Sequence, residues 1–92
     1  MAKYNNQVLT DLFCLNCGNK GIPIYRKRNG IREAGHRKAL YCIHCRETVN
    51  HYECRNTNEI YDFKQRFSAG EFAEEAKNSI AYIKAEKGSM VL

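Results

Sequence analysis

The stretches CLNCG (residues 14–18) and CIHCR (residues 42–46) each contain two cysteines separated by two residues. This spacing lets both thiolates of a pair reach one metal ion across a tight turn, and two such pairs complete a tetrahedral site. The 24 residues between Cys17 and Cys42 exceed the roughly 15–20 that are common in such sites, which indicates an enlarged loop within a hairpin. The sequence therefore predicts one metal site, whose ligands are Cys14, Cys17, Cys42 and Cys45.

Zinc is the metal expected at this site, as one structural Zn²⁺. Four thiolates fill the coordination sphere and leave no open position for a substrate water. In small zinc modules a metal-binding free energy of about 10–16 kcal/mol acts as folding free energy, so removal of zinc should unfold the amino-terminal half. Iron is the alternative because rubredoxin also uses two such pairs, but its pairs are normally each followed by glycine. Gly18 fits that pattern and Arg46 does not, so the second turn is expected to be less regular.

The length and the amino-terminal composition indicate the class of protein. A chain of 92 residues forms one domain with a marginal apolar core, so a metal or a cross-link is expected to stabilise it. The amino-terminal residues show no signal-peptide pattern, which favours a reducing cytoplasm where paired thiols bind metal. No segment approaches the roughly 20 apolar residues of a membrane span. We therefore expect a soluble cytoplasmic protein that has no membrane partner.

Short runs of β-type residues alternate with turn signals in the first half of the chain. Strands are expected over residues 8–13, 22–28, 36–42 and 46–54. Pro23 should lie at a strand start or edge, because it has no N–H to donate to a ladder. Residues 29–35 (NGIREAG) are expected to form one loop with a second bend at Gly35. The alternative is a tight hairpin at Asn29-Gly30.

The apolar period becomes helical after residue 56. A first helix is predicted over residues 58–67, with Asn56 and Glu59 as its N-terminal cap pair. A second helix should start at SAGE (residues 68–71), where Ser68 and Glu71 resemble a capping box, and end at Gly88. Its predicted buried face contains Phe72, Ala73, Ala76, Ile80 and Ile83. Its predicted outer face contains Glu74, Glu75, Lys77, Lys84 and Glu86.

Other histidines and the fifth cysteine could also bind a metal. His44 lies inside the second cysteine pair, where its side chain should point away from the ion. His51 and Cys54 follow Cys45 by six and nine residues, which is roughly 20 and 30 Å along an extended strand, so neither should reach that ion. Cys54 is expected to be a small buried residue. A second site built from His36, His51 and Cys54 stays open.

Positive charge is concentrated in the cysteine half. Residues 1–55 contain ten Lys/Arg and four Asp/Glu, whereas residues 56–92 contain five and six. The formal net charge of +5 falls to about +3 when four thiolates and one Zn²⁺ are counted. A basic face attracts phosphates and also acidic protein surfaces. The candidate contact residues are Arg26, Lys27, Arg28, Arg32, Arg37 and Lys38 in the basic segment, and Glu71, Glu74 and Glu75 in the tail.

Two kinds of partner are consistent with these candidates. In the first hypothesis the basic residues contact nucleic-acid phosphates while Tyr25 and Tyr41 stack on exposed bases. The alternative for these tyrosines is a place in the core. In the second hypothesis the partner is a protein, and the carboxylates of the GEFAEE segment (residues 70–75) imitate phosphates. The alternative for that segment is a solvated helix face whose acids favour the helix amino terminus.

The segments FCLNCGNKG (residues 13–21) and YCIHCRE (residues 41–47) resemble the two knuckles of a zinc ribbon. Together with the helical tail at residues 58–87, they make the chain similar to small accessory proteins of bacterial viruses, and among these to the zinc-containing anti-CRISPR proteins. This resemblance implies a non-enzymatic inhibitor that binds a lobe of the type II CRISPR effector nuclease and hinders guide or target-DNA loading. A faint similarity to HNH nucleases fails because the chain has no Asp-His pair and no histidine after residue 54.

The sequence thus predicts a single α+β domain that contains a four-cysteine zinc ribbon of antiparallel β-hairpins (residues 8–55), followed by a tail of two short helices (residues 56–88). The expected function is that of a zinc-binding interaction protein without catalytic activity. A phage inhibitor of the type II CRISPR effector nuclease, active in the host bacterial cytoplasm, is the leading hypothesis. A nucleic-acid-binding ribbon that serves as a transcriptional or replication accessory factor is the alternative.

Overall fold

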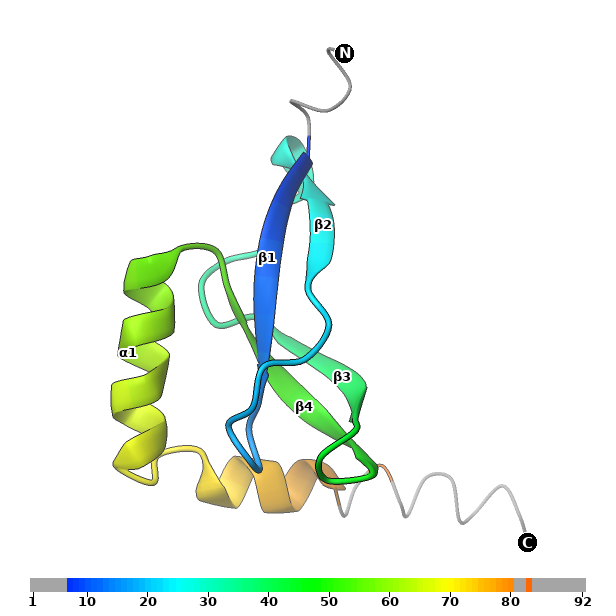
Figure 1. Cartoon of the computed structure of the whole chain (residues 1–92), viewed down its shortest axis with the longest axis vertical. Helices are drawn as coiled ribbons and strands as arrows, with labels where there is room; N and C mark the ends of the chain where they lie inside the picture. Colours follow the sequence, from blue (N-terminus) through cyan, green and yellow to red (C-terminus); the bar gives the residue numbers. More distant parts are fainter. Residues whose placement is uncertain (1–6, 81–82, 84–92) are drawn as a thin grey trace, which may run out of the picture.

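The computed structural model describes residues 7–80 and residue 83. Four strands form one antiparallel sheet in the order β2-β1-β4-β3, and helix α1 (Thr57–Ser68) and a second helix over residues 73–80 follow them (Figure 1). The strands are β1 (Gln7–Cys14), β2 (Ile24–Lys27), β3 (Arg37–Cys42) and β4 (Glu47–Cys54). The predicted α+β fold, with antiparallel hairpins followed by two helices, is confirmed.

Strand β1 joins the two hairpins of the sheet. Its first half, Gln7 to Thr10, pairs with β2, and its second half, Asp11 to Cys14, pairs with β4. The first cysteine pair therefore begins at the last residue of β1, and the second pair begins at the last residue of β3 and continues into the turn before β4. Pro23 immediately precedes β2, as expected for a residue that cannot donate to the ladder.

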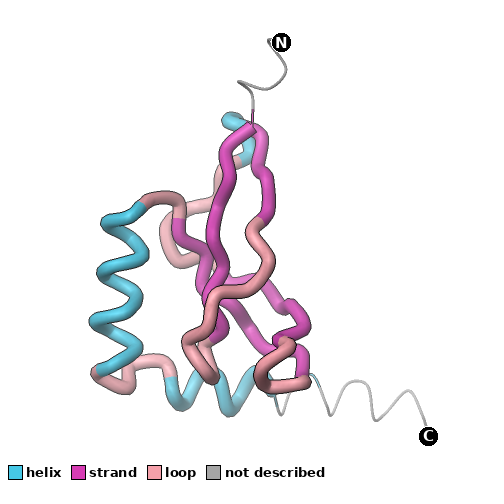
Figure 2. The backbone as a smooth tube through the Cα atoms, in the orientation of Figure 1, coloured by secondary structure: helices cyan, strands magenta, loops and turns pink. Residues whose placement is uncertain are grey.

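The connection from β2 to β3 is the predicted loop rather than a tight hairpin. It begins with a short 3-10 turn, η2 (Arg28–Gly30), and continues without regular structure to a bend at Gly35 (Figure 2). The loop is tied back to the sheet, because the Gly35 N–H donates to the Glu53 carbonyl oxygen at 3.0 Å. The expectation for residues 29–35 is therefore confirmed.

The helices pack against one face of the sheet. Alternation along β1 and β4 places Phe13, Tyr52 and Cys54 on this face, where they form a buried cluster with Phe63 of α1 and Phe72. Aromatic centroids in this cluster lie between 5.1 and 5.7 Å apart. The second helix crosses the end of the sheet near the cysteine loops (Figure 1), where Ile80 packs against the buried Cys14 and Cys42.

The amino terminus of α1 follows the prediction. Asn56 precedes the first helical residue, and its side-chain oxygen accepts a hydrogen bond from the Glu59 N–H at 3.0 Å. One of the N–H groups that have no partner within the helix is thereby satisfied. Glu59 adds a second contact, because its carboxylate accepts from the Arg55 backbone N–H at 2.7 Å. The predicted pair of Asn56 and Glu59 is confirmed.

The predicted capping box at SAGE is wrong. Ser68 is the last residue of α1, and the N–H groups of Gly70 and Glu71 donate to the carbonyl oxygens of Phe67 and Arg66 at 3.0 and 3.1 Å. Gly70 adopts a left-handed φ of 81°, so this segment closes α1 as a Schellman motif. The Glu71 N–H that Ser68 was expected to bind is already used, and the second helix begins at residue 73.

This later start corrects one position on the predicted buried face of the second helix. Phe72 and Ala76 are buried and Ile80 and Ile83 are half-buried, but Ala73 is exposed and Ser79 is buried in its place. The Ser79 hydroxyl donates to the Ala76 carbonyl oxygen and accepts from the Asn50 N–H, at 3.1 and 3.2 Å, so no polar group is left unpaired. Lys84, Glu86 and Gly88 lie outside the described residues.

Candidate functional site

The four predicted ligands meet at one end of the sheet. The Sγ atoms of Cys14, Cys17, Cys42 and Cys45 all lie within 4.8 Å of one another. Two of the separations are 3.8 Å, between Cys14 and Cys45, and 3.6 Å, between Cys17 and Cys42. A tetrahedral zinc site with Zn–S distances of about 2.3 Å requires S–S separations of about 3.8 Å. The donor set therefore fits one Zn²⁺, and the five cysteines of the chain are all free of disulfide bonds.

The two cysteine turns have the same backbone geometry. The Gly18 N–H donates to the Cys14 carbonyl oxygen at 2.8 Å, and the Arg46 N–H donates to the Cys42 carbonyl oxygen at 2.7 Å. Both residues have a left-handed φ, 77° at Gly18 and 57° at Arg46. The expectation of a less regular second turn is therefore wrong, because Arg46 adopts the conformation that glycine usually supplies, at a cost of about 1–2 kcal/mol.

Amide groups donate hydrogen bonds to the thiols, a feature that the sequence analysis missed. The side-chain amide of Asn16 donates to the Cys45 sulfur and that of Asn19 to the Cys17 sulfur, each at 3.3 Å. The backbone N–H groups of Asn16 and Cys45 reach the Cys14 and Cys42 sulfurs at 3.4 Å. Such contacts orient ligands and spread their charge. The signal in the sequence was the pair of asparagines that flank Cys17 in LNCGN (residues 15–19).

The thiols of the cluster differ in acidity because their surroundings differ. Burial raises the pKa of Cys14 far above its usual value, and burial is also the main cause of the raised pKa of Cys45. At Cys17 burial opposes ionisation, but hydrogen bonds from the Asn19 backbone and side chain and from neighbouring thiols bring its pKa to about 7. The pKa of Cys17 is therefore lower than those of Cys14 and Cys45, so Cys17 supplies a thiolate at neutral pH more readily than they do.

The other candidate ligands do not join the cluster. His44 is exposed, and within the described residues the only group of three or more close metal-type ligands is the set of four cysteines. His51 and Cys54 are both buried, but their odd separation along β4 directs them to opposite faces of the sheet. The second metal site of His36, His51 and Cys54, which the sequence left open, is therefore not formed. Burial raises the pKa of Cys54 to about 12, as expected for an inert buried thiol, and burial lowers the pKa of His51.

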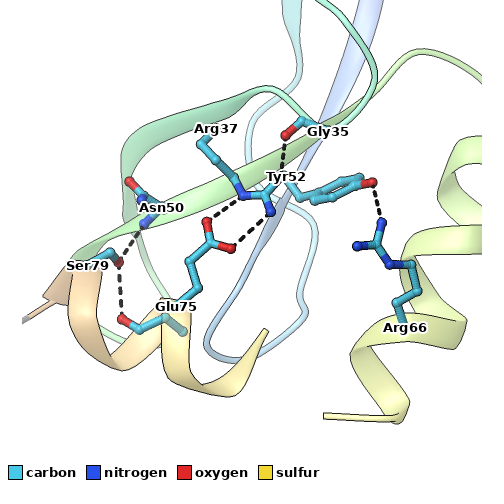
Figure 3. Close-up of polar contacts among 8 residues, drawn as sticks. Gly35, Arg37, Asn50, Tyr52, Arg66, Glu75 and Ser79 are labelled. Atoms are coloured by element: carbon cyan, nitrogen blue, oxygen red, sulfur yellow. Dashed lines mark hydrogen bonds and ion pairs between the residues drawn. The ribbon is translucent and has the colours of Figure 1, made fainter. Parts of the chain in front are cut away.

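Arg26 and Arg37, among the basic candidates, are held in ion pairs with residues of the described part of the chain. Arg26 makes a bidentate contact with Glu53, with N–O distances of 2.9 and 3.1 Å, and the Glu53 carboxylate is fully buried. Arg37 binds Glu75 of the second helix at 2.5 and 3.0 Å and lies over the Tyr52 ring (Figure 3). Arg26 links β2 to β4, and Arg37 links β3 to the second helix, so both are poor candidates for phosphate contacts.

Some of the acidic candidates are likewise already held in ion pairs, and one is not. Glu75 is engaged by Arg37, and Glu71 accepts from Arg66 at 3.3 Å. Arg66 also donates to the Tyr52 hydroxyl at 3.1 Å, so it connects α1 to the sheet (Figure 3). Glu74 is exposed, and no ion pair engages it within the described part of the chain. Two of the three proposed phosphate mimics are therefore already paired with arginine.

The remaining basic candidates and both tyrosines face solvent. Lys27, Arg28 and Arg32 are exposed and Lys38 is half-buried. Tyr25 and Tyr41 are 68% and 61% exposed, which excludes the alternative that placed them in the core. Large apolar side chains accompany them, since Ile22 is 81% and Ile43 is 73% exposed. Each of these tyrosines, and Lys27, Arg28 and Arg32, is therefore accessible from solvent.

No protein-family model, curated protein or solved structure matches this chain. Within the described residues, no helix is both long enough and apolar enough to cross a membrane. The assignment of a function therefore depends on the cysteine cluster and on the surfaces around it.

Proposed function

We propose that this chain is a zinc-binding protein without catalytic activity and that it binds single-stranded nucleic acid. The observation that supports the proposal best is the exposure of Tyr25 and Tyr41 on the basic half of the chain. Stacking of a base on an aromatic side chain contributes about 1–3 kcal/mol per base and accepts any base, because every base has a π-face. Exposed tyrosines next to lysines therefore suit a strand whose bases are unpaired.

The zinc ion has a structural role in this proposal. It holds the end of β1 against the turn between β3 and β4, because its ligands come from both places. Four thiolates complete its coordination sphere, and its binding contributes folding free energy. The metal thereby fixes the positions of the strands that carry Tyr25 and Tyr41.

Phosphate contacts are assigned to the basic residues that are not used inside the fold. Lys27, Arg32 and Lys38 have no ion pair within residues 7–80, in contrast to Arg26 and Arg37. Arg28 is exposed, but it makes a contact of its own and is not counted among these three. Single-strand binding weakens with salt by a slope of about −0.7 per neutralised phosphate, so three contacts predict a loss of about 20-fold between about 50 and 200 mM salt.

Fluorescence anisotropy tests the proposal. Labelled single-stranded RNA, single-stranded DNA and duplex DNA are titrated with the zinc-loaded full chain at both salt concentrations. We expect single strands to bind, and we expect a variant with Lys27→Glu, Arg32→Glu and Lys38→Glu to lose that binding. A matched variant with Lys64→Glu and Lys77→Glu, which are exposed helical lysines, should retain most of it. Absence of binding by the unmodified chain at the lower salt concentration would refute the proposal.

A protein inhibitor of the type II CRISPR effector nuclease is the second candidate, and it follows the resemblance to zinc-containing anti-CRISPR proteins. One observation favours a protein partner. A hollow of about 590 Å³ lies between the first cysteine turn and the helices, and it could accept an apolar side chain. Its lining residues are Leu15, Asn16, Phe67, Gly70, Ala73, Lys77 and Ile80.

Inhibition of DNA cleavage by that nuclease distinguishes the two candidates. An inhibitor should block cleavage, and the charge-reversed variant at Lys27, Arg32 and Lys38 need not lose this effect. In contrast, Ala73→Arg should abolish it, because a long charged side chain would enter the hollow beside the exposed Ala73. Unchanged cleavage at saturating concentrations of the zinc-loaded chain would exclude the inhibitor.

A further inference from the structure

A second hollow, of about 320 Å³, lies on the sheet face that carries His51. We call it the His51 hollow, and its lining residues are Gly21, Ile22, Ile24, Leu40, Tyr41 and His51. All of them belong to strands or to the connection between β1 and β2, and none belongs to a helix of the described residues. The register supports this placement, because Leu40 is the β-ladder partner of Val49, two residues before His51 on the same face.

The floor of the His51 hollow contains a polar atom that has no hydrogen-bond partner among residues 7–80. The ring of His51 is 1% exposed, and its Nδ1 lies 2.8 Å from the Val49 carbonyl oxygen. A carbonyl oxygen only accepts, so Nδ1 carries the proton, and Nε2 of the neutral ring is a hydrogen-bond acceptor. No hydrogen bond to Nε2 occurs within the described residues.

This acceptor is not sealed inside the protein. Every fully buried side-chain nitrogen or oxygen of the described residues has a hydrogen-bond partner, so the unpartnered Nε2 retains access to the space beside it. That space is narrow at Gly21, because a Cβ atom there would lie 3.4 Å from Nε2. The hollow therefore offers one directed acceptor within an otherwise apolar lining.

The rim of the His51 hollow combines flat, apolar and basic groups. Tyr41, on the edge strand β3, and Ile22 both line the hollow and are 61% and 81% exposed. Lys38 is the β-ladder partner of His51 and lies two residues before Leu40, so it shares the face of the hollow. No ion pair engages Lys38 within residues 7–80, which leaves its charge available to an anion.

We propose that the His51 hollow binds one unpaired base of a single-stranded nucleic acid. The base stacks on Tyr41, donates an N–H group to Nε2 of His51, and places its phosphate near Lys38. This assignment rests on the nucleic-acid function proposed above and names the site at which that function reads a base. A volume near the lower end of small-molecule pockets, about 300–1,000 Å³, suits one planar ring system rather than a large ligand.

Charge and donor chemistry favour a nucleobase over an apolar side chain from a protein. An apolar side chain would leave the buried Nε2 of His51 without a partner, whereas adenine, cytosine, guanine and uracil each carry at least one N–H donor. A nucleotide also brings the phosphate that Lys38 can neutralise. The occupant is therefore a nucleotide, and RNA and DNA differ only at the sugar.

NMR of the zinc-loaded full chain during titration with short single strands tests the site. We expect upfield ring-current shifts of the methyl signals of Ile22, Ile24 and Leu40, together with a shift of the His51 Nε2 signal. Two isoleucines outside the hollow serve as controls, and their methyl signals should not move. Ile43 is exposed, and Ile60 of α1 packs against the aromatic cluster between the helices and the sheet. Parallel titrations with RNA and DNA of the same sequence show which sugar is preferred.

Affinity measurements of variants complete the test. Tyr41→Ala should weaken binding by about 5- to 100-fold, and Tyr41→Phe should restore it, because stacking requires the ring and not the hydroxyl. Tyr61→Ala, at a tyrosine of α1 that is 67% exposed, should leave binding unchanged. If strands bind but the methyl and Nε2 signals of the hollow do not move, the site is wrong and the proposed function stands. If no strand binds, both proposals fall.

Discussion

The ion pair between Arg26 and Glu53 allows a quantitative test of the fold. Glu53 is completely buried in β4, and Arg26 of β2 is 17% exposed, so the two partners lose different amounts of hydration. Arg26→Met leaves the buried carboxylate without its ion-pair partner, which should lower the free energy of unfolding by about 3–5 kcal/mol. Glu53→Gln should cost about 1–3 kcal/mol, because the released guanidinium can turn toward solvent.

The double variant with Arg26→Met and Glu53→Leu provides the matched comparison. Replacement of a buried ion pair by apolar groups of similar size is often neutral, so the double variant should be more stable than Arg26→Met alone. Urea unfolding, followed by circular dichroism with zinc in excess, measures all four proteins. A cost below about 1 kcal/mol for Arg26→Met, or a double variant less stable than both single variants, would refute the reasoning.

The loss of stability in Arg26→Met should also change with pH in a direction that can be worked out. Burial alone would raise the pKa of Glu53, but the hydrogen bonds and charge of Arg26, with the Thr10 hydroxyl, hold it below its usual value. A lowered pKa in the folded state stabilises the protein above the pKa of the unfolded chain, and this stabilisation is lost as the pH falls through the folded value. Arg26→Met removes the strongest opposition to burial, so burial raises that pKa, and the deficit in stability should be smaller at about pH 5.5 than at about pH 7.5.

Three further predictions concern the cysteine turns. Gly18→Ala should destabilise the protein by about 2–4 kcal/mol, because φ is 77° and a Cβ would lie 2.7 Å from the Phe67 ring. The control Gly30→Ala, with no atom within 4 Å, should be nearly neutral, and equal costs at both sites would contradict the packing of Phe67 on the first turn. Arg46→Gly should raise the free energy of unfolding by up to about 1 kcal/mol, since it relieves a left-handed φ of 57°, and a loss of stability would contradict this. A chelator that removes zinc should abolish the β-sheet signal in circular dichroism, and Co²⁺ in place of zinc should show the absorption of four thiolates, which Cys17→Ser should reduce. A sheet that survives proven metal loss would contradict the structural role of the metal.

Features that depend on neighbouring residues could be predicted from the sequence. The spacing within Cys14–Cys17 and Cys42–Cys45 is sufficient to place two thiols on one tight turn, and the structure brings the pairs together. The cap of α1 at Asn56 is equally local, because donor and acceptor are three residues apart. The SAGE segment shows the limit of such patterns. Its residues are compatible both with a capping box that starts a helix and with a motif that ends one. Only the hydrogen bonds of Gly70 and Glu71 to the preceding turn show that it ends α1.

The tertiary structure decided which surface residues are available to a partner. The basic segment contains similar residues, yet Arg26 and Arg37 are paired with Glu53 and Glu75, which lie 27 and 38 residues away, whereas Lys27, Arg32 and Lys38 have no ion pair within residues 7–80. The open acceptor of His51 likewise depends on the passage of Gly21 beside β4. Charge and residue type are properties of each position along the chain, but the partner of a charged group is set by strand order and helix packing. The sequence therefore identified four cysteines that could hold one metal ion and the class of fold, and only the folded arrangement determined which charges, rings and acceptors remain free to bind.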